Sequence, residues 1–273
     1  MSNINTILTG PFLRFIICLM ILPILPSGCS SAMQNFSTKP LRDEVIVLGM
    51  IHGGHRTSKI YSIDRIEEMV RKIKPDYILC EIPPDRFETA VNQFRATGKI
   101  TEPRVRVFPE YVSAIIPMYV DEGTFELIPC AGWTKEMSDD RNEKLSRWKS
   151  KRPDDYAKME TAENEATQLL KERGLNEDPL KIDLPEYDEI VRKGLEPYNR
   201  LFNDDLGPGG WGNINRAHFA LITRAIDEHH SVAGDSYPKR FLITFGAWHK
   251  YWFLDHLRNR PDIRVLSLAE ALQ

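Results

Sequence analysis

The chain has 273 residues and a formal net charge of −3, and 42% of its residues are hydrophobic and 27% charged. These proportions are typical of a globular protein and exclude a disordered chain, which carries fewer apolar residues. The slightly acidic balance argues against nucleic-acid binding, because such proteins use a basic surface to displace the counterions of phosphate groups. The mean hydropathy of −0.37 excludes a protein with many membrane spans. Only the N-terminal segment is therefore expected to touch a membrane.

Residues 1–29 are predicted to form a signal peptide with a lipidation motif. The apolar run 15–25 has the length of a signal-peptide core and is too short to span a hydrocarbon layer of about 30 Å. The segment Leu25-Pro26-Ser27-Gly28-Cys29 resembles a bacterial lipobox, in which the cysteine receives a lipid, although Pro26 replaces the usual Leu, Val or Ile. A plain cleaved signal or a short anchor is the alternative. We expect an exported lipoprotein of the bacterial cell envelope, anchored through Cys29, on the periplasmic or outer-membrane side.

The remaining chain alternates apolar runs with helical patterns. Residues 30–42 are expected to be a flexible tether, and residues 43–273 a single domain. Short apolar runs predict buried strands at 45–48, 77–80, 125–129, 241–245 and 263–266. Helical periodicity predicts helices at 63–73, 85–96, 111–120, 214–229 and 248–258. Alternating strands and helices predict an α/β fold with a mixed, mainly parallel central sheet flanked by helices.

The middle of the chain has a different composition. From about residue 133 to 205, charged residues dominate, strand patterns disappear, and helical periodicity covers 141–150, 155–173 and 187–202. A glycine-rich stretch at 207–212 follows and is typical of a hinge. We interpret this region as a helical insertion over the sheet.

Two cysteines, Cys80 and Cys130, lie in the part of the chain that follows the predicted signal peptide. No C-x-x-C motif is present, so the sequence offers no cysteine-based metal or redox site. Buried thiols are the favoured state, and a disulfide between neighbouring strands is the alternative.

Polar residues follow three of the predicted strands. The motifs Gly49-Met50-Ile51-His52 and Gly246-Ala247-Trp248-His249 each come directly after an apolar run, and Glu81 ends a third. Glycine is expected here because it lets the backbone turn sharply at the strand end. Ligands of open α/β sheets bind outside the carboxyl ends of the strands. We therefore expect the three side chains to share one edge of the sheet.

Two imidazoles and a carboxylate are suitable ligands for a divalent transition metal ion at a catalytic site. Each residue also has a purely structural interpretation. His249 lies in the aromatic stretch 248–253 and would then be a core histidine, whereas Glu81 would pair with Arg86. The pair Gly53-Gly54 lacks the other residues of a phosphate-binding loop, which excludes nucleotide binding.

The two ends of this domain resemble the TraB/PrgY/GumN family, which is related to the Tiki metalloproteases and more distantly to erythromycin-esterase-like and haem-binding ChaN-like proteins. The resemblance lies in the G-x-x-H motif at His52, the segment Lys74-Pro75-Asp76 before a strand ending in Glu81, and the second G-x-x-H motif at His249. It covers about residues 44–90 and 210–270. The best match to the arginine motif of these families is Asn215-Arg216-Ala217, which keeps only the arginine.

This resemblance implies a metal-dependent hydrolase with a peptidase-like or esterase-like activity. His52, Glu81 and His249 would bind manganese, cobalt or zinc, and Glu81 would also take part in catalysis. Arg216 and Arg86 would stabilise the developing oxyanion. Pairing of Arg216 with Asp204 or Asp205 is the structural alternative. The expected partner is a peptide or a small-molecule substrate.

A second hypothesis is a lipoprotein of the envelope without catalytic activity. It would bind haem through His52 or His249, or hold a peptide without cutting it. The aromatic residues at 248–253 would suit an apolar haem slot, although this spacing is also typical of a helix packed in the core.

Overall fold

The protein is described by a computed structural model that covers residues 41–232 and 235–273, all of which belong to one compact unit, Thr38–Gln273. The predicted signal peptide, Cys29 and all but the last two residues of the predicted tether lie outside the described residues. None of the described helices combines the length and the apolar character that crossing a membrane requires.

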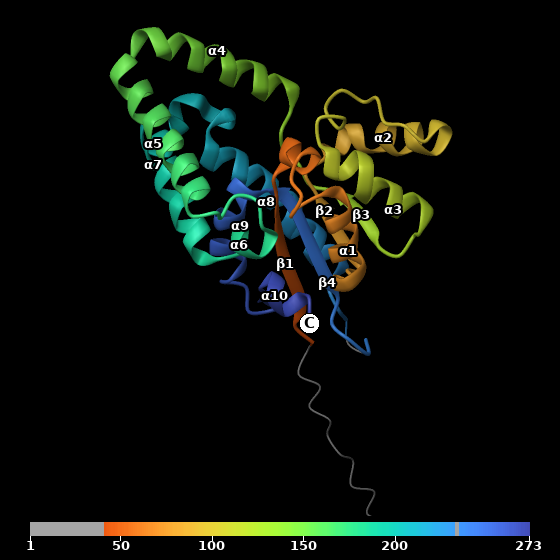
Figure 1. The fold of residues 1–273 in the computed structure, drawn as a ribbon. Helices are drawn as coiled ribbons and strands as arrows, with labels where there is room; N and C mark the ends of the chain where they lie inside the picture. The colour runs from red at the N-terminus through yellow and green to blue at the C-terminus, as the bar shows by residue number, and fades with distance from the viewer. Residues whose placement is uncertain (1–40, 233–234) are drawn as a thin grey trace, which may run out of the picture. The chain divides into compact units, whose positions relative to one another are not determined.

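The described strands form a five-stranded sheet in the order β3-β2-β4-β1-β5 (Figure 1). All pairs are parallel, which confirms the α/β fold and makes the sheet more uniform than the predicted mixed one. Because both faces are covered, the strands are continuous apolar runs instead of alternating ones. Their bounds are β1 Asp43–Met50, β2 Tyr77–Cys80, β3 Glu126–Pro129, β4 Arg240–Gly246 and β5 Ile263–Leu266.

Strand β4 lies between β1 and β2, although it comes from the other end of the chain. Met50 at the end of β1 pairs with Gly246 of β4, and Cys80 at the end of β2 pairs with Thr244. The carboxyl ends of these three strands therefore lie side by side.

Side chains of each strand alternate between two cores. Ile46, Leu48 and Met50 join one cluster with helix α1, whereas Val45 and Val47 join another with helices α8 and α9.

Ser62 caps α1, as its side chain accepts a hydrogen bond from the Arg65 backbone. The helices outside the insertion are α1 Ile63–Ile73, α2 Pro84–Thr97, α3 Ile116–Asp121, α8 Trp211–His229, α9 Lys250–Leu257 and α10 Leu268–Ala271.

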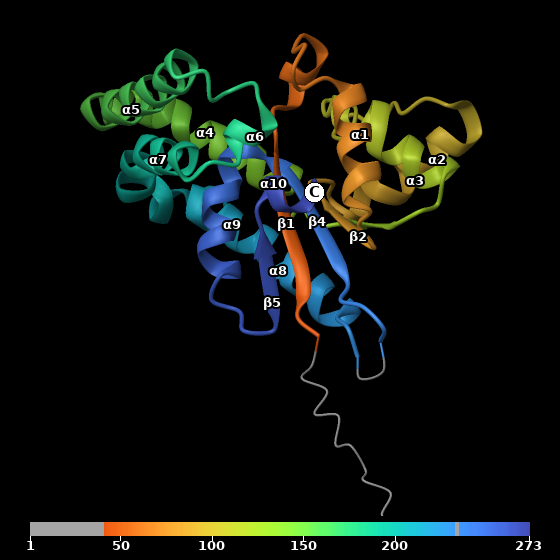
Figure 2. The same cartoon turned by 60° about the horizontal axis from the view of Figure 1, so that its bottom comes forward.

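The middle of the chain is the helical insertion that its composition predicts. It contains α4 Lys135–Lys151, α5 Pro153–Glu172, α6 Pro179–Ile182 and α7 Pro185–Leu206. Figures 1 and 2 show α4, α5 and α7 on one side of β1 and β4, and α1, α2 and α3 on the other. The insertion has a third apolar cluster of its own, formed by Trp148, Met159, Tyr198, Phe202 and Leu206.

The two cysteines are buried and unpaired. Burial raises the pKa of both thiols, that of Cys130 to about 12. They are therefore core residues, as the favoured prediction states.

Candidate metal centre

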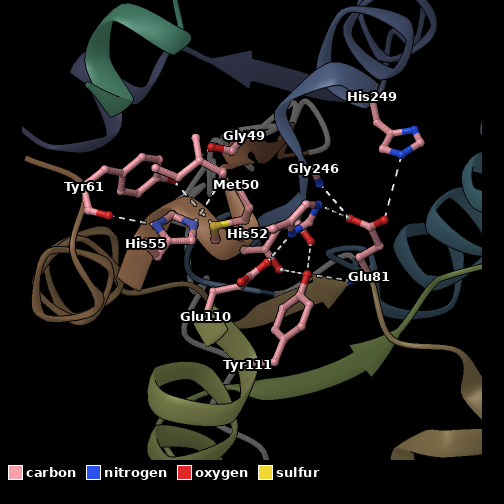
Figure 3. A network of polar contacts seen from close by, with 12 residues as sticks. Gly49, Met50, His52, His55, Tyr61, Glu81, Glu110, Tyr111, Gly246 and His249 are labelled. Atoms are coloured by element: carbon pink, nitrogen blue, oxygen red, sulfur yellow. Dashed lines mark hydrogen bonds and ion pairs between the residues drawn. The ribbon is translucent and has the colours of Figure 1, made fainter. Parts of the chain in front are cut away.

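The three residues singled out by the sequence come together at the carboxyl edge of the sheet. His52 begins the short turn η1 His52–Arg56 after β1, Glu81 follows β2, and His249 ends the turn η4 Ala247–His249 after β4. Nε2 of His52 lies 3.6 Å from Oε2 of Glu81, and Nε2 of His249 lies 3.9 Å from its Oε1. Figure 3 shows the Glu81 carboxylate in contact with both imidazoles.

A third imidazole, that of His218 on α8, also reaches this group. One ligand atom from each of Glu81, His218 and His249 lies within 4.8 Å of the other two, so these three residues could hold a metal ion. His52, which the sequence predicts as a ligand, is not part of this group of three. The ring of His218 meets that of His249 edge-on, with a centroid distance of 5.2 Å. No motif in the sequence marks His218. Its signal is its spacing of four from Ile214 and Ile222, which places it on the buried stripe of an amphipathic helix.

A buried amide fixes the ring of His249. Nδ1 of His249 lies 2.6 Å from Oδ1 of Asn215, and the amide nitrogen of Asn215 donates to the carbonyl of Trp211 at 2.9 Å. Because the amide nitrogen of Asn215 donates to Trp211, the amide oxygen of Asn215 is the atom that faces the imidazole. Nδ1 of His249 must therefore be the donor in this contact. Burial holds the pKa of His249 well below its usual value, so the ring is neutral. Its Nε2 therefore presents a lone pair to the cluster.

A buried carboxylate fixes the ring of His52. Nδ1 of His52 lies 2.6 Å from Oε1 of Glu110, a side chain with no exposed surface. Burial by itself lowers the pKa of His52, but Glu110 and Glu81 outweigh it and raise this pKa to about 9. Without a metal ion the ring is thus protonated near neutral pH. A metal ion that binds Nε2 has to displace that proton.

His218 has the opposite arrangement of hydrogen bonds. The backbone N–H of Gly132 donates to its Nδ1 at 2.8 Å, and burial lowers its pKa to about 3. In a neutral ring whose Nδ1 accepts, the hydrogen resides on Nε2. His218 therefore presents a donor to the cluster, whereas His249 presents an acceptor.

Glu81 is held through its carboxylate and through its backbone. Burial raises its pKa, whereas the positive charge of His52 opposes this shift. The backbone N–H of Gly246 donates to Oε2 of Glu81 at 2.7 Å, and the Glu81 backbone N–H donates to the hydroxyl of Tyr111 at 2.8 Å. Hydrogen bonds thus hold Glu81 to strand β4 and to the segment that contains Tyr111.

Tyr111 comes from a segment in which the sequence predicts an ordinary helix over 111–120, and Glu110 directly precedes that segment. The structure begins instead with the π-helical turn η2 Tyr111–Ile115, which leads into α3. Turns of this kind are frequent at functional sites because they change the direction of side chains within a helix. No periodic pattern in the sequence marks either residue.

The glycines of the two motifs have a different role from the predicted one. Gly246 has φ −46° and ψ 133°, a conformation open to other residues, and Gly49 is not among the glycines with positive φ. A Cβ atom on Gly246 would lie 2.6 Å from Nε2 of His52, and one on Gly49 would lie 2.9 Å from the Cβ of Ala247. Both positions favour glycine because an added Cβ atom would lie too close to neighbouring atoms. The prediction that glycine is needed for a sharp turn of the backbone was therefore wrong. The left-handed residue is His52 itself, with φ 47°.

His55 supports the turn that carries His52. It is buried, its Nδ1 contacts the carbonyl of Tyr61 at 2.8 Å, and its Nε2 accepts the Ile51 backbone N–H at 3.1 Å. The Tyr61 hydroxyl in turn donates to the carbonyl of Gly49 at 3.0 Å. These contacts tie the residues before and after His52 to the end of β1.

Two cavities meet at the cluster. Glu81 and His218 line the first, of about 420 Å³, and His52 and Gly246 line the second, of about 470 Å³. His249 and Trp211 line both, and their rings are stacked with a centroid distance of 4.4 Å. A molecule can therefore approach the imidazoles from either side.

The two predicted arginines are not part of this site. Arg216 is exposed and donates to the side chain of Asn213, not to Asp204 or Asp205. Arg86 lies 3.0 Å from Asp85 and lines neither of the two cavities, and it does not pair with Glu81.

The arginines that line the first cavity are Arg104 and Arg141. Arg141 stands in Asp140-Arg141-Asn142, which matches the arginine motif of the resembled families more closely by its letters than Asn215-Arg216-Ala217 but lies too far upstream. Arg104 stands in no motif.

Comparisons of the chain with protein-family models, curated proteins and solved structures found no match. The resemblance to the TraB/PrgY/GumN family thus rests on the motifs quoted above.

Proposed function

We propose that this protein is a hydrolase that depends on a divalent metal ion held by His52, Glu81 and His249. The observation that supports this proposal is that two imidazole Nε2 atoms face one carboxylate while an acceptor fixes each ring at Nδ1. Histidines that bind metals usually have such an outer partner, which sets the tautomer. Three protein ligands beside open cavities are typical of a catalytic centre.

The donor set suits manganese, cobalt or zinc, since all three accept imidazole and carboxylate ligands. A bound divalent ion would polarise a carbonyl group and lower the pKa of a water molecule. His218 would donate a hydrogen bond from Nε2 to the oxygen that gains negative charge at the scissile carbonyl. We thus assign to His218 the role that the sequence suggested for Arg216 and Arg86.

The volumes of the two cavities fit a substrate of moderate size. Each has a volume within the range of about 300–1,000 Å³ that is usual for small-molecule sites. A peptide segment or a small molecule would place one group in each cavity and its scissile bond beside His249 and Trp211. The proposed bond is an ester or an amide, in keeping with the esterase-like or peptidase-like activity that the family resemblance implies.

Metal analysis tests this proposal. The full chain, purified without chelators, should contain about one divalent transition metal ion. His52→Ala, Glu81→Ala and His249→Ala should each lose most of it. His218→Ala should keep the metal, because His218 is a donor, and should lose the hydrolysis of model esters or amides. The exposed His256→Ala is the matched control for loss of an imidazole. Full metal content in the first three variants would contradict the proposal.

The proposed location is the bacterial cell envelope, supported by the apolar N-terminal run and the lipobox-like segment that ends in Cys29. Cys29→Ala should move the protein from the membrane fraction to the soluble fraction. A variant that stays in the membrane fraction would contradict anchoring by lipid.

A further inference from the structure

The first cavity carries two arginine side chains that the proposed catalytic step does not use. Arg104 lies in the segment after α2, and Arg141 lies on α4 of the insertion. Both side chains are partly buried. Arg104 donates to the carbonyl of Trp133, and Nε of Arg141 donates to the hydroxyl of Tyr198 at 2.9 Å. Neither guanidinium has a carboxylate within 4.0 Å among the residues that the structure describes.

These contacts orient the two groups and leave other donors free. The Arg141 guanidinium lies 5.6 Å from the centre of the Tyr198 ring and 6.0 Å from that of Trp133. Nη1 and Nη2 of Arg141 have no recorded acceptor among the described residues, and the same holds for Nε and Nη1 of Arg104. Glu163 interacts with Arg141 and Glu136 with Arg104 only at longer range. A partly buried guanidinium without a direct ion pair would therefore be stabilised by an incoming anion.

Aromatic side chains surround these free donors. Phe108, Trp133 and Trp211 line the same cavity, as do His218 and His249 of the metal centre. A ligand there would meet positive charge at one end and aromatic walls beside it. Its charged group would lie next to the residues that act on the scissile bond.

We infer that the first cavity is a subsite for an anionic group, a carboxylate or a phosphate, that is attached to an apolar part of the substrate. Arg104 and Arg141 recognise the anion, since planar guanidinium groups bind both kinds of oxyanion through paired hydrogen bonds. The substrate class of the proposed hydrolase is thus an ester or amide with an acidic group close to the bond that is cleaved. The assignment to a substrate rests on the proposed function, whereas the binding of the anion does not.

Binding of simple aromatic anions tests this inference. The full chain, freed of metal by chelation, is titrated with benzoate, phenyl phosphate and the neutral benzamide, and binding is followed by calorimetry and by the fluorescence of Trp133 and Trp211. At least one anion should bind about tenfold or more tightly than benzamide, because a hydrogen bond to a charged group contributes about 1.5–3 kcal/mol. The tighter anion identifies the natural group as carboxylate or phosphate. Equal affinity for benzamide, or no binding of either anion, would overturn the inference.

Variants locate the binding site. Arg104→Gln and Arg141→Gln should each weaken binding of the tighter anion about tenfold. Arg147→Gln removes a charge from an exposed position of the same helix, α4, and should bind the anion like the unchanged chain. Arg141→Lys keeps the charge and should bind with intermediate affinity. Unchanged affinity in both glutamine variants would overturn the inference even if an anion binds.

One variant separates this inference from the proposed function. His52 does not line the first cavity, so His52→Ala should lose the metal and keep the affinity for the anion. A chain that binds the anion through Arg104 and Arg141 but never binds a metal would contradict only the proposed hydrolase. A chain that binds the metal but does not bind the anion would contradict only the proposed anion subsite.

Discussion

Oδ1 of Asn215 lies 2.6 Å from Nδ1 of His249, and this contact joins helix α8 to the turn that follows strand β4. It sets the tautomer of the imidazole and keeps Nε2 directed at Glu81. The neighbouring residue, Arg216, is exposed. Successive residues of an α-helix differ by about 100° in direction, so Asn215 and Arg216 cannot serve the same site.

Asn215→Ala should weaken metal binding by about 10–100-fold, the usual effect of removing the outer partner of a ligating histidine. A competition assay with a chromophoric chelator measures this change. Arg216→Ala is the matched control and should have no effect, since its side chain is exposed and, among the described residues, hydrogen-bonds only to the side chain of Asn213. A larger loss in Arg216→Ala than in Asn215→Ala would contradict the roles assigned to this helix.

Gly246→Ala should abolish most metal binding and leave the fold intact. The added Cβ would lie 2.6 Å from Nε2 of His52 and 3.5 Å from Oε2 of Glu81, so the two proposed ligands would have to separate. Gly53→Ala, directly after the other motif, is the control, because its Cβ would come no closer than 4.0 Å to a neighbouring atom, Nη1 of Arg56. Circular dichroism checks the fold of both variants, and metal analysis measures occupancy. A normal metal content in Gly246→Ala would show that metal binding does not require the space between residue 246 and His52.

Glu44 should stabilise the fold in a pH-dependent way. Nε of Arg240 donates to its Oε2 at 2.8 Å, and Arg264 contacts its Oε1. Burial opposes ionisation, but the two arginines outweigh it and lower the pKa of Glu44 below 4.5. A lowered pKa in the folded state means that this stabilisation is complete above the unfolded pKa and disappears as the pH falls through the folded pKa.

Urea unfolding of the unchanged chain and of Glu44→Gln measures this contribution. Near neutral pH the variant should lose about 1–3 kcal/mol of unfolding free energy, because each partner keeps its charge without a carboxylate. The difference between the two proteins should shrink once the pH is below 4.5. A difference that stays constant over this range would mean that the charge of Glu44 contributes nothing.

Phe202→Ala should destabilise the insertion. The Phe202 ring is 1% exposed and stacks on Trp148 with a centroid distance of 5.1 Å. Truncation of a buried phenylalanine costs about 3–5 kcal/mol of unfolding free energy. Leu180→Ala in the same insertion removes a side chain that is 40% exposed and should change the stability by less than about 0.5 kcal/mol. Equal effects in denaturant unfolding would contradict a packed third cluster.

The sequence could predict the strands, the helices and three residues of the candidate metal centre because each is marked by a local pattern along the chain. Continuous apolar runs mark the parallel strands, and the stripe Ile66, Met69, Val70 and Ile73 marks α1. Parallel strands present their carboxyl ends at one edge, so His52, Glu81 and His249 at three strand ends are expected on the same edge of the sheet.

Only the tertiary structure determined which strands are neighbours and what surrounds the centre. The insertion of β4 between β1 and β2 is a pairing between distant segments, and no local pattern encodes it. Glu110 lies 58 positions from the histidine that it fixes, and Asn215 lies 34 positions from His249. Arg104 reaches the first cavity from outside any motif, and Arg141 reaches it from far upstream of the place where the arginine motif is expected. Such contacts depend on the direction of each side chain after packing, which the spacing along the chain does not specify.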